Sequence, residues 1–316
     1  MVQFFQNRKN KLVLEKNWLL NMEKDCWSIV FENFGLKTIT VLSTVCKLLY
    51  ECVNQKTLWE RLCKSGRLLE GVDAENKTYS KDFYKKIYVF KKWCIKHKIN
   101  WNSVFKNVEL VSSDCRMSCL PAEISLLQNL RYLNLHNNWL TSLPVEIGSL
   151  KNLQGLYLHN NRLTSLPVEI GSLQNLRFLG LNSNQLTNLP VEIGSLRNLK
   201  IVLLDNNQLT NLPAEIGSLQ KLKRLYLSSN QLTILPAEIG SLQNLKYLFL
   251  ESNQLTCLPA EIGSLQNLLY LHLDNNQLTC LPDEFLLLQN LRYLGWTNNK
   301  MDILPEIGLL NMKVKM

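Results

Sequence analysis

A 23-residue phrase that returns almost unchanged from Leu130 to Pro305 constrains the fold of this chain more than any other feature. The copy at 130–152 reads LRYLNLHNNWLTSLPVEIGSLKN, and the copy at 153–175 reads LQGLYLHNNRLTSLPVEIGSLQN. Six more copies begin at Leu176, Leu199, Leu222, Leu245, Leu268 and Leu291. Self-similarity at this period predicts a solenoid, in which each unit packs only against its neighbours.

The array has irregular copies at both ends. A weaker copy begins at Asn107 and has Cys115 where the other copies carry asparagine. The last copy departs from the phrase at Pro305 and is one residue short. After it, Met312, Val314 and Met316 alternate with two lysines, a pattern that predicts a closing strand whose charges discourage pairing with another molecule.

Each copy predicts one strand and one short helical segment. In LRYLNL the side chains alternate, so Leu133 and Leu135 are expected to point into the core while the residues between them point outward. Asn138 and its equivalents are expected to be buried and to bond backbone groups of adjacent turns. Pro144 then begins a helical segment that buries Ile147.

The phrase LxxLxLxxNxLxxLPxEIGxLxN resembles a leucine-rich repeat, and the LPxEIG portion resembles the subgroup found in intracellular Ras-binding and plant Ras-group-related proteins. The resemblance covers 107–305. It implies an α/β solenoid bent into an arc, with parallel strands on the concave face. Strands stack about 4.8 Å apart while helical segments need about 8–10 Å, so the stack bends toward the strands.

The outward strand positions vary between copies and are flanked by a mostly basic edge on one side. Exposed aromatic residues beside Arg and Lys are typical of protein-binding surfaces. We therefore expect the concave face to bind a target protein. The candidate residues are Tyr132, Tyr157, Phe178, Arg224, Tyr226, Tyr247, Phe249, Tyr270, His272 and Tyr293. The alternative is that Tyr and Phe occupy these positions because they favour strands.

The first hundred residues predict helices. Trp27, Val30, Phe31 and Phe34 fall on one face of an expected helix. Another helix is expected to begin at Thr57, where the sequence carries a capping signature. The segment 25–63, DCWSIVFENFGLKTITVLSTVCKLLYECVNQKTLWERLC, resembles an F-box, although Met22-Glu23 stands where that family has Leu-Pro.

The resemblance implies a small all-α bundle that docks a Skp-type adaptor. The residues implied in adaptor binding are Val30, Phe31, Val45, Leu58 and Trp59. The alternative is a generic three-helix bundle that caps the solenoid.

Four regions follow: an N-terminal tail at 1–21, the F-box-like domain at 22–63, a linker and capping helix at 64–106, and the repeat domain at 107–316. The capping helix is expected to begin at Ser80, with an apolar stripe that includes Phe90 and Cys94.

Charge is concentrated at one end. Residues 1–106 carry 20 Lys and Arg against 10 Asp and Glu, a net of +10, which leaves a net of −1 for the remainder. A nucleic-acid binder using the lysine-rich helix at 80–98 is therefore one functional class to weigh. Acidic residues on the repeat face argue against it, and lysines on the solvent faces of helices account for the charge.

No membrane segment or signal peptide is evident, and nine cysteines stand at no disulfide-framework spacing, so we expect free thiols in the cytoplasm or nucleus. The glycine, histidine and cysteine patterns predict no catalytic residues, no metal and no cofactor. His136 and His159 share a repeat position without a paired nucleophile, and Cys119, Cys257 and Cys280 lack a second pair at zinc spacing.

Together the two resemblances imply a non-catalytic substrate-recognition subunit of a cullin–RING ubiquitin ligase. The head would bind a Skp-type adaptor and cullin, the repeats would bind an unidentified target protein, and the chain would be a monomer within that complex. The alternative is a signalling scaffold that binds a small GTPase or phosphatase, with the helical head only a cap.

Overall fold

A computed structural model describes residues 89–90, 92–97, 99, 108–300 and 313–315. The chain divides into two compact units, Met1–Val89 and Phe90–Met316. The F-box-like segment 22–63, the cap predicted at Ser80 and the short last copy at Pro305 all lie outside the described residues. The second unit contains the repeats.

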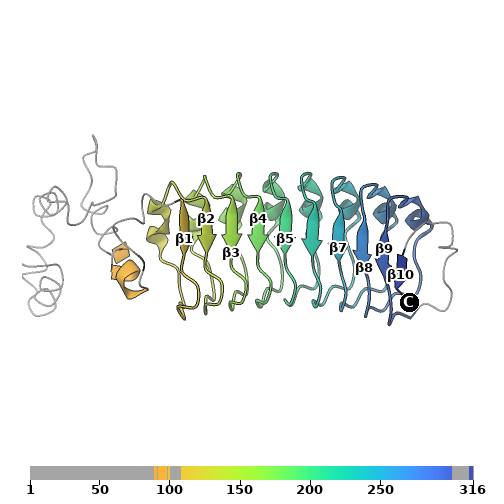
Figure 1. The fold of residues 1–316 in the computed structure, drawn as a ribbon, viewed down its shortest axis with the longest axis horizontal. Helices are drawn as coiled ribbons and strands as arrows, with labels where there is room; N and C mark the ends of the chain where they lie inside the picture. Colours follow the sequence, from red (N-terminus) through yellow and green to blue (C-terminus); the bar gives the residue numbers. More distant parts are fainter. Residues whose placement is uncertain (1–88, 91, 98, 100–107, 301–312, 316) are drawn as a thin grey trace, which may run out of the picture. The chain divides into compact units, whose positions relative to one another are not determined.

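Within the described residues, ten strands form one parallel sheet in sequence order, side by side on one side of the repeats (Figure 1). The strands are β1 Glu109–Val111, β2 Tyr132–Asn134, β3 Gly155–Tyr157, β4 Phe178–Gly180, β5 Ile201–Leu203, β6 Arg224–Tyr226, β7 Tyr247–Phe249, β8 Tyr270–His272, β9 Tyr293–Gly295 and β10 Lys313–Lys315. β1 belongs to the weak first copy, and β10 pairs with β9 as the predicted closing strand.

The other side of each repeat carries a five-residue 3-10 helix. These are η1 Ala122–Leu126, η2 Val145–Ser149, η3 Val168–Ser172, η4 Val191–Ser195, η5 Ala214–Ser218, η6 Ala237–Ser241, η7 Ala260–Ser264 and η8 Asp283–Leu287. In η2 the N–H of Ile147 donates to the carbonyl of Pro144 at 3.0 Å, an i to i+3 bond. Pro144 itself is an extended N-cap, so the helix begins one residue later than predicted. The helical layer of the described repeats is therefore 3-10, which suits such short segments.

The predicted core is confirmed. Leu133, Leu135, Ile147 and their described equivalents are fully buried or nearly so, except Trp296, which is half-buried at the Leu135 position of the last copy. Each repeat buries one strand face and one helical face between its neighbours, so the core is continuous along the array.

Buried asparagines join consecutive repeats, as the sequence predicts. The Nδ2 of Asn207 donates to the carbonyls of Leu181 and Leu204, both at 3.0 Å, and its Oδ1 accepts from the N–H of Leu186 at 3.0 Å. The same bonds recur at the equivalent asparagines, and together we call them the asparagine ladder. Its members are Asn138, Asn161, Asn184, Asn207, Asn230, Asn253, Asn276 and Asn299. One side chain thus satisfies backbone groups in the preceding repeat and in its own.

The glycine of LPxEIG lies inside the 3-10 helix, where it allows the next repeat to approach. A Cβ on Gly217 would lie 2.5 Å from the carbonyl oxygen of Glu238 and 2.8 Å from its Cβ. This glycine therefore serves close packing between consecutive repeats.

Gly217→Ala is expected to lower the free energy of unfolding by about 1–3 kcal/mol, because the added methyl group meets backbone that must shift. Ala214→Val on the same helix is the matched control, since Val191 occupies the equivalent exposed position one repeat earlier. Urea unfolding followed by circular dichroism measures both variants. Equal stability of the two would contradict the packing role.

Residues 89–90 and 92–96 are helical. Phe90 and Cys94 are fully buried while Lys92 and Lys96 are exposed, which confirms the described part of the predicted stripe. Burial raises the pKa of the Cys94 thiol to about 12. Across the described residues, no helix combines the length and apolarity that crossing a membrane requires.

Candidate functional site

The outward strand positions form two columns that cross the sheet, as predicted. The first column runs from Tyr132 through Gly155, Phe178, Ile201, Arg224, Tyr247 and Tyr270 to Tyr293, each residue paired in register with the next. The second runs from Asn134 through Tyr157, Gly180, Leu203, Tyr226, Phe249 and His272 to Gly295. We call this surface the strand face.

Four rings of the strand face stack in one continuous series, the aromatic ladder. Tyr226 and Phe249 have ring centroids 4.6 Å apart and planes 5° apart. His272 continues the ladder 4.4 Å from Phe249, and Tyr293 lies 4.6 Å beyond it. Parallel strands about 4.8 Å apart place side chains of one column at stacking distance, so the sheet itself sets the spacing of the rings.

A second row runs beside the ladder. The guanidinium of Arg224 lies 4.9 Å from the ring centroid of Tyr247, which stacks on Tyr270 at 5.0 Å. Tyr270 in turn lies 6.3 Å from Tyr293, so the two rows meet at β9. They meet because Gly295 has no side chain to continue the second column.

The ten predicted site residues separate into two groups. Seven of them, from Arg224 to Tyr293, form the two rows just described. The other three lie nearer the N-terminus, where Tyr157 stacks on Phe178 at 4.5 Å across the space left by Gly180. Ile201 and Leu203 on β5 separate the groups. The sequence places all ten residues on one face. Their separation into two groups depends on Ile201 and Leu203 of β5 and on the gaps at glycines such as Gly180.

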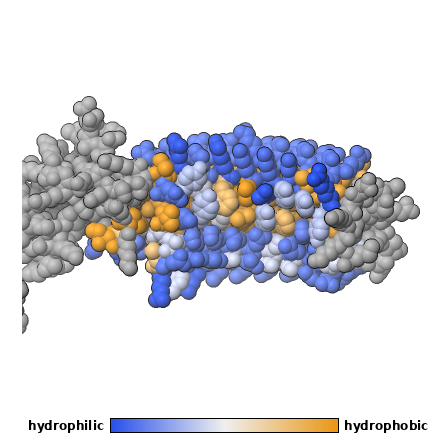
Figure 2. All heavy atoms as spheres, viewed as in Figure 1, coloured by the Kyte–Doolittle hydropathy of each residue, from blue (hydrophilic) through white to orange (hydrophobic). Residues whose placement is uncertain are grey.

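Charges of opposite sign flank the strand face. The residue before most strands is basic and exposed, and these residues form a basic edge of Arg131, Arg177, Lys200, Lys223, Lys246 and Arg292, interrupted by Gln154 and Leu269. Two residues beyond the strands lie the half-buried Asp205, Glu251 and Asp274. Figure 2 shows a paler, partly hydrophobic band across the strands between two hydrophilic edges. A partner on this face therefore meets cations on one flank and anions on the other.

Two of the carboxylates also serve the fold. The Oδ1 of Asp274 accepts hydrogen bonds from the Thr297 N–H at 3.1 Å and from the Thr297 hydroxyl at 2.6 Å. Its Oδ2 lies 4.0 Å from Nδ1 of His272, next to the aromatic ladder. The Oδ1 of Asp205 accepts from the N–H of Ser228 at 3.0 Å. These hydrogen bonds could not be predicted from the sequence, because the residue at the donor position, Thr297 or Ser228, differs from repeat to repeat.

Burial raises the pKa of Asp205, and the nearby Glu251 carboxylate adds to this, although hydrogen bonds from Ser228 oppose it. A carboxyl group with a raised pKa in the folded state binds protons more tightly there than in the unfolded chain. Its contribution to stability therefore falls as the pH rises from 3.8, its ordinary pKa, through the raised value.

Asp205→Asn is expected to increase the free energy of unfolding at pH 7, because asparagine avoids the buried charge and keeps an acceptor for Ser228. Asn182 occupies the equivalent position one repeat earlier. The gain over wild type should widen as the pH rises from below 3.8 and then level off. Urea unfolding across that range measures it, and a gain that shrinks with rising pH would contradict the assignment.

His136 and His159 stack in the column that carries the carboxylates farther along. Their ring centroids lie 4.6 Å apart with planes 8° apart. Burial lowers the pKa of His159, and the neighbouring His136 lowers it further. The structure places no nucleophile between them, and among the described residues no group of three or more His, Cys, Asp or Glu is arranged to hold a metal ion. The described thiols at Cys119, Cys257 and Cys280 are free and exposed.

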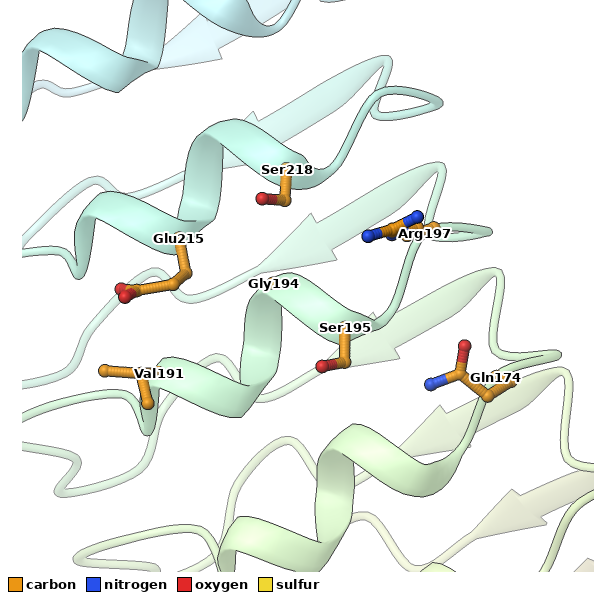
Figure 3. Close-up of a pocket in the computed structure, with 7 residues that line it drawn as sticks. All are labelled: Gln174, Val191, Gly194, Ser195, Arg197, Glu215 and Ser218. Atoms are coloured by element: carbon orange, nitrogen blue, oxygen red, sulfur yellow. The ribbon is translucent and has the colours of Figure 1, made fainter.

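Shallow grooves lie between consecutive 3-10 helices on the described helical side. Figure 3 shows one groove, where Arg197 and Glu215 lie on either side of Gly194 and Ser195. A similar groove recurs one repeat farther along, around Gly217. The recurrence indicates that these grooves result from the glycine packing, so the strand face remains the candidate site.

A parallel sheet with one strand per repeat and an open aromatic surface defines a solenoid of short repeats. Family models identify its type. The model described as "Leucine-rich repeat region" matches residues 168–246 and 235–314, and the model described as "Leucine rich repeat" matches 128–186. Over residues 128–314 the chain is therefore a leucine-rich repeat protein. No F-box model is among the matches.

Solved structures agree with this fold. A leucine-rich repeat protein of Leptospira interrogans is 48% identical with a TM-score of 0.61, and the match covers 63% of this chain and 52% of that one. This chain thus spans about half the length of that protein. A plant peptide hormone receptor in complex with RGF2 is 30% identical with a TM-score of 0.54, covering 60% of this chain and 32% of the receptor.

The Drosophila Toll–Spatzle complex also matches, at 30% identity and a TM-score of 0.57, covering 64% of this chain and 28% of that one. Comparison with curated proteins returned no match. Leucine-rich repeat proteins are protein-interaction scaffolds, and two of these neighbours were solved as complexes.

Proposed function

We propose that the strand face binds a partner protein, with the aromatic ladder and Arg224 at the centre of contact. The observation that carries this proposal is the continuous stacking of Tyr226, Phe249, His272 and Tyr293 on the open side of the sheet. Each ring is half buried by its neighbours and already ordered. Binding therefore costs little additional side-chain entropy, which favours affinity.

The flanking charges define the kind of partner surface that fits. Lys200, Lys223 and Lys246 attract acidic residues along one flank, while Glu251 and Asp274 attract basic residues along the other. Between them, the rings favour aromatic, aliphatic or guanidinium groups. A partner with this order of charges binds in a defined orientation, and partners of the reverse order meet like charges.

Quantitative affinity capture tests this proposal. Wild type is compared with a variant that combines Arg224→Ala, Tyr226→Ala and Phe249→Ala, and with a control that combines Val145→Ala, Val168→Ala and Val191→Ala on the helical side. Alanine stands at the control position in η5, η6 and η7, so the control folds. We expect a set of proteins that the control retains and the face variant loses. Identical sets from all three would overturn the proposal.

We further propose that the whole chain is the substrate-recognition subunit of a cullin–RING ubiquitin ligase in the cytoplasm or nucleus. The support is the F-box resemblance at 22–63, with Val30, Phe31, Val45, Leu58 and Trp59 as adaptor contacts. The chain would act without catalysis, because holding a target near the charged ubiquitin carrier raises the effective concentration of its lysines.

Co-expression of the full chain with a Skp-type adaptor tests the ligase role. We expect the two to co-purify, and Leu58→Ala with Trp59→Ala to abolish this while the strand-face partner is retained. Failure of the wild-type chain to hold the adaptor would reject the ligase role and leave the protein-binding role standing. The LPxEIG phrase then favours the signalling scaffold that binds a small GTPase or phosphatase.

A further inference from the structure

An exposed tryptophan lies between two arginines just beyond the strand face. The guanidinium of Arg116, from the preceding repeat, lies 5.6 Å from the ring centroid of Trp139. The guanidinium of Arg162, from the following repeat, lies 5.1 Å from the same ring. Trp139 is 44% exposed, and both arginines are exposed. The three side chains form one stack, which we call the Arg–Trp–Arg stack.

This stack departs from the repeated phrase. The same position holds glutamine in the next five repeats, at Gln185, Gln208, Gln231, Gln254 and Gln277. A neutral, flexible side chain thus satisfies the repeat architecture here. Two arginines and a tryptophan are not required for folding, so their presence at one end of the array needs a separate explanation.

The charge of the stack is not neutralised by its surroundings. Within the part of the chain that the structure describes, no carboxylate forms an ion pair with Arg116 or Arg162. The Trp139 ring offsets only part of the repulsion between the two cations, because a cation–π contact at an exposed site is weak. Both exposed guanidinium groups thus retain N–H donors that no ion pair within the described residues occupies.

The backbone holds the stack in place. The Trp139 N–H donates to the carbonyl of Met117 at 2.9 Å, and the Arg162 N–H donates to the carbonyl of Leu140 at 2.9 Å. Trp139 also follows directly on Asn138 of the asparagine ladder. The repeats therefore set the spacing of these backbone positions, and the indole ring spaces the two guanidinium groups. Guanidinium groups with restricted motion bind carboxylates well, because the planar fork matches both carboxylate oxygens.

We propose that the Arg–Trp–Arg stack is a second docking site, for the carboxylate side chains of an acidic segment of a protein partner. It is separate from the strand face, since Trp139 lies beyond the last outward position, His136, and past the turn at Asn138. Each guanidinium takes one carboxylate, and the indole edge between them contacts the intervening chain. The site depends neither on the aromatic ladder nor on the adaptor role.

Nuclear magnetic resonance with a hexaglutamate peptide as the probe tests this site. The indole N–H signal of Trp139 is assigned by its loss in Trp139→Gln, which restores the repeat residue. In wild type we expect this signal to shift saturably with hexaglutamate, less so as salt is added, and not with hexaglutamine. In Arg116→Gln with Arg162→Gln the apparent affinity at this signal should fall at least about tenfold, which corresponds to 1.4 kcal/mol.

The control removes two cations elsewhere, through Lys200→Gln with Lys223→Gln on the strand face. It should leave the Trp139 titration unchanged, which separates this site from the proposed face. An indole signal that does not move with hexaglutamate overturns the proposal, as does an equal shift in the double arginine variant. A shift of the same size with inorganic phosphate at equal concentration would indicate a free-anion site and would also overturn it.

Discussion

Replacing Phe249 by alanine is expected to weaken binding of the strand-face partner at least about 30-fold, the effect of losing a hot-spot aromatic residue worth about 2 kcal/mol. Phe249 stacks on Tyr226 at 4.6 Å and on His272 at 4.4 Å, so it is the ring that joins the two halves of the aromatic ladder. Its removal deletes contact area with the partner. It also frees the two neighbouring rings to move, so their ordering must occur during binding.

Two matched variants make this test specific. Phe249→Tyr keeps the ring, and tyrosine already occupies the same column at Tyr226, so its affinity should stay within about threefold of wild type, or ~0.7 kcal/mol. Val191→Ala on the helical side should leave affinity unchanged. Titration calorimetry with the partner obtained by affinity capture measures the dissociation constants of wild type and of the three variants. An affinity for Phe249→Ala equal to that of Val191→Ala would show that the ladder is not the contact surface.

Asn207→Ala is expected to lower the free energy of unfolding by about 3 kcal/mol or more, because several buried backbone groups lose their partner at once and each costs about 1–3 kcal/mol. The N–H of Leu186 and the carbonyls of Leu181 and Leu204 all bond to the Asn207 side chain. These backbone groups are buried in the core, and the alanine side chain can neither donate nor accept a hydrogen bond. The loss falls at the centre of the array, between repeats on both sides.

The adjacent residue provides the control. Asn206 is exposed with a φ of 55°, and serine occupies the same left-handed position at Ser183, Ser229 and Ser252. Asn206→Ser is therefore expected to change stability by less than about 0.5 kcal/mol. Urea unfolding followed by circular dichroism compares the variants. If Asn207→Ala were as stable as Asn206→Ser, the asparagine ladder would not hold the repeats together.

Repetition explains why so much of the repeat domain could be predicted from sequence. Each position recurs in eight good copies, so its environment is sampled eight times: leucine at Leu133 and its equivalents marks the core, and variation at Tyr247 marks the surface. The parallel strand order, the asparagine ladder and the two columns follow from that comparison, and the structure confirms them. The strand face could be located because its outward positions carry residues that differ from one copy to the next.

Details that depend on atomic contact could not be predicted. The helical segments are 3-10 because five residues must fit between a proline and a buried leucine, and apolar spacing at Ile147 and Leu150 suits either helix type. The role of Gly217 depends on the approach of Glu238 from the next repeat, and the pKa of Asp205 depends on its burial. The Arg–Trp–Arg stack was missed, although its departure from a glutamine column was visible in the sequence.

The F-box-like segment at 22–63 is a different kind of prediction. It occurs once, so no second copy within the chain separates core positions from surface positions. Its support is a small number of phrases, chiefly Val45-Cys46-Lys47 and Leu58-Trp59, at the family's spacing. Co-expression with the Skp-type adaptor is therefore needed to decide the ligase role, whereas the geometry of the repeat domain already establishes its fold.

The asparagine ladder has a consequence for how this protein can change over generations. The six junctions from Gly148 to Gly263 use nearly the same leucines, the same asparagine bonds and the same glycine approach. A gain or loss of one whole 23-residue unit therefore recreates an existing junction, while a gain or loss of any other length brings polar residues into the interior. Whole-unit duplication can thus lengthen the array or bring new side chains together on its surface, and the interior needs no compensating substitution.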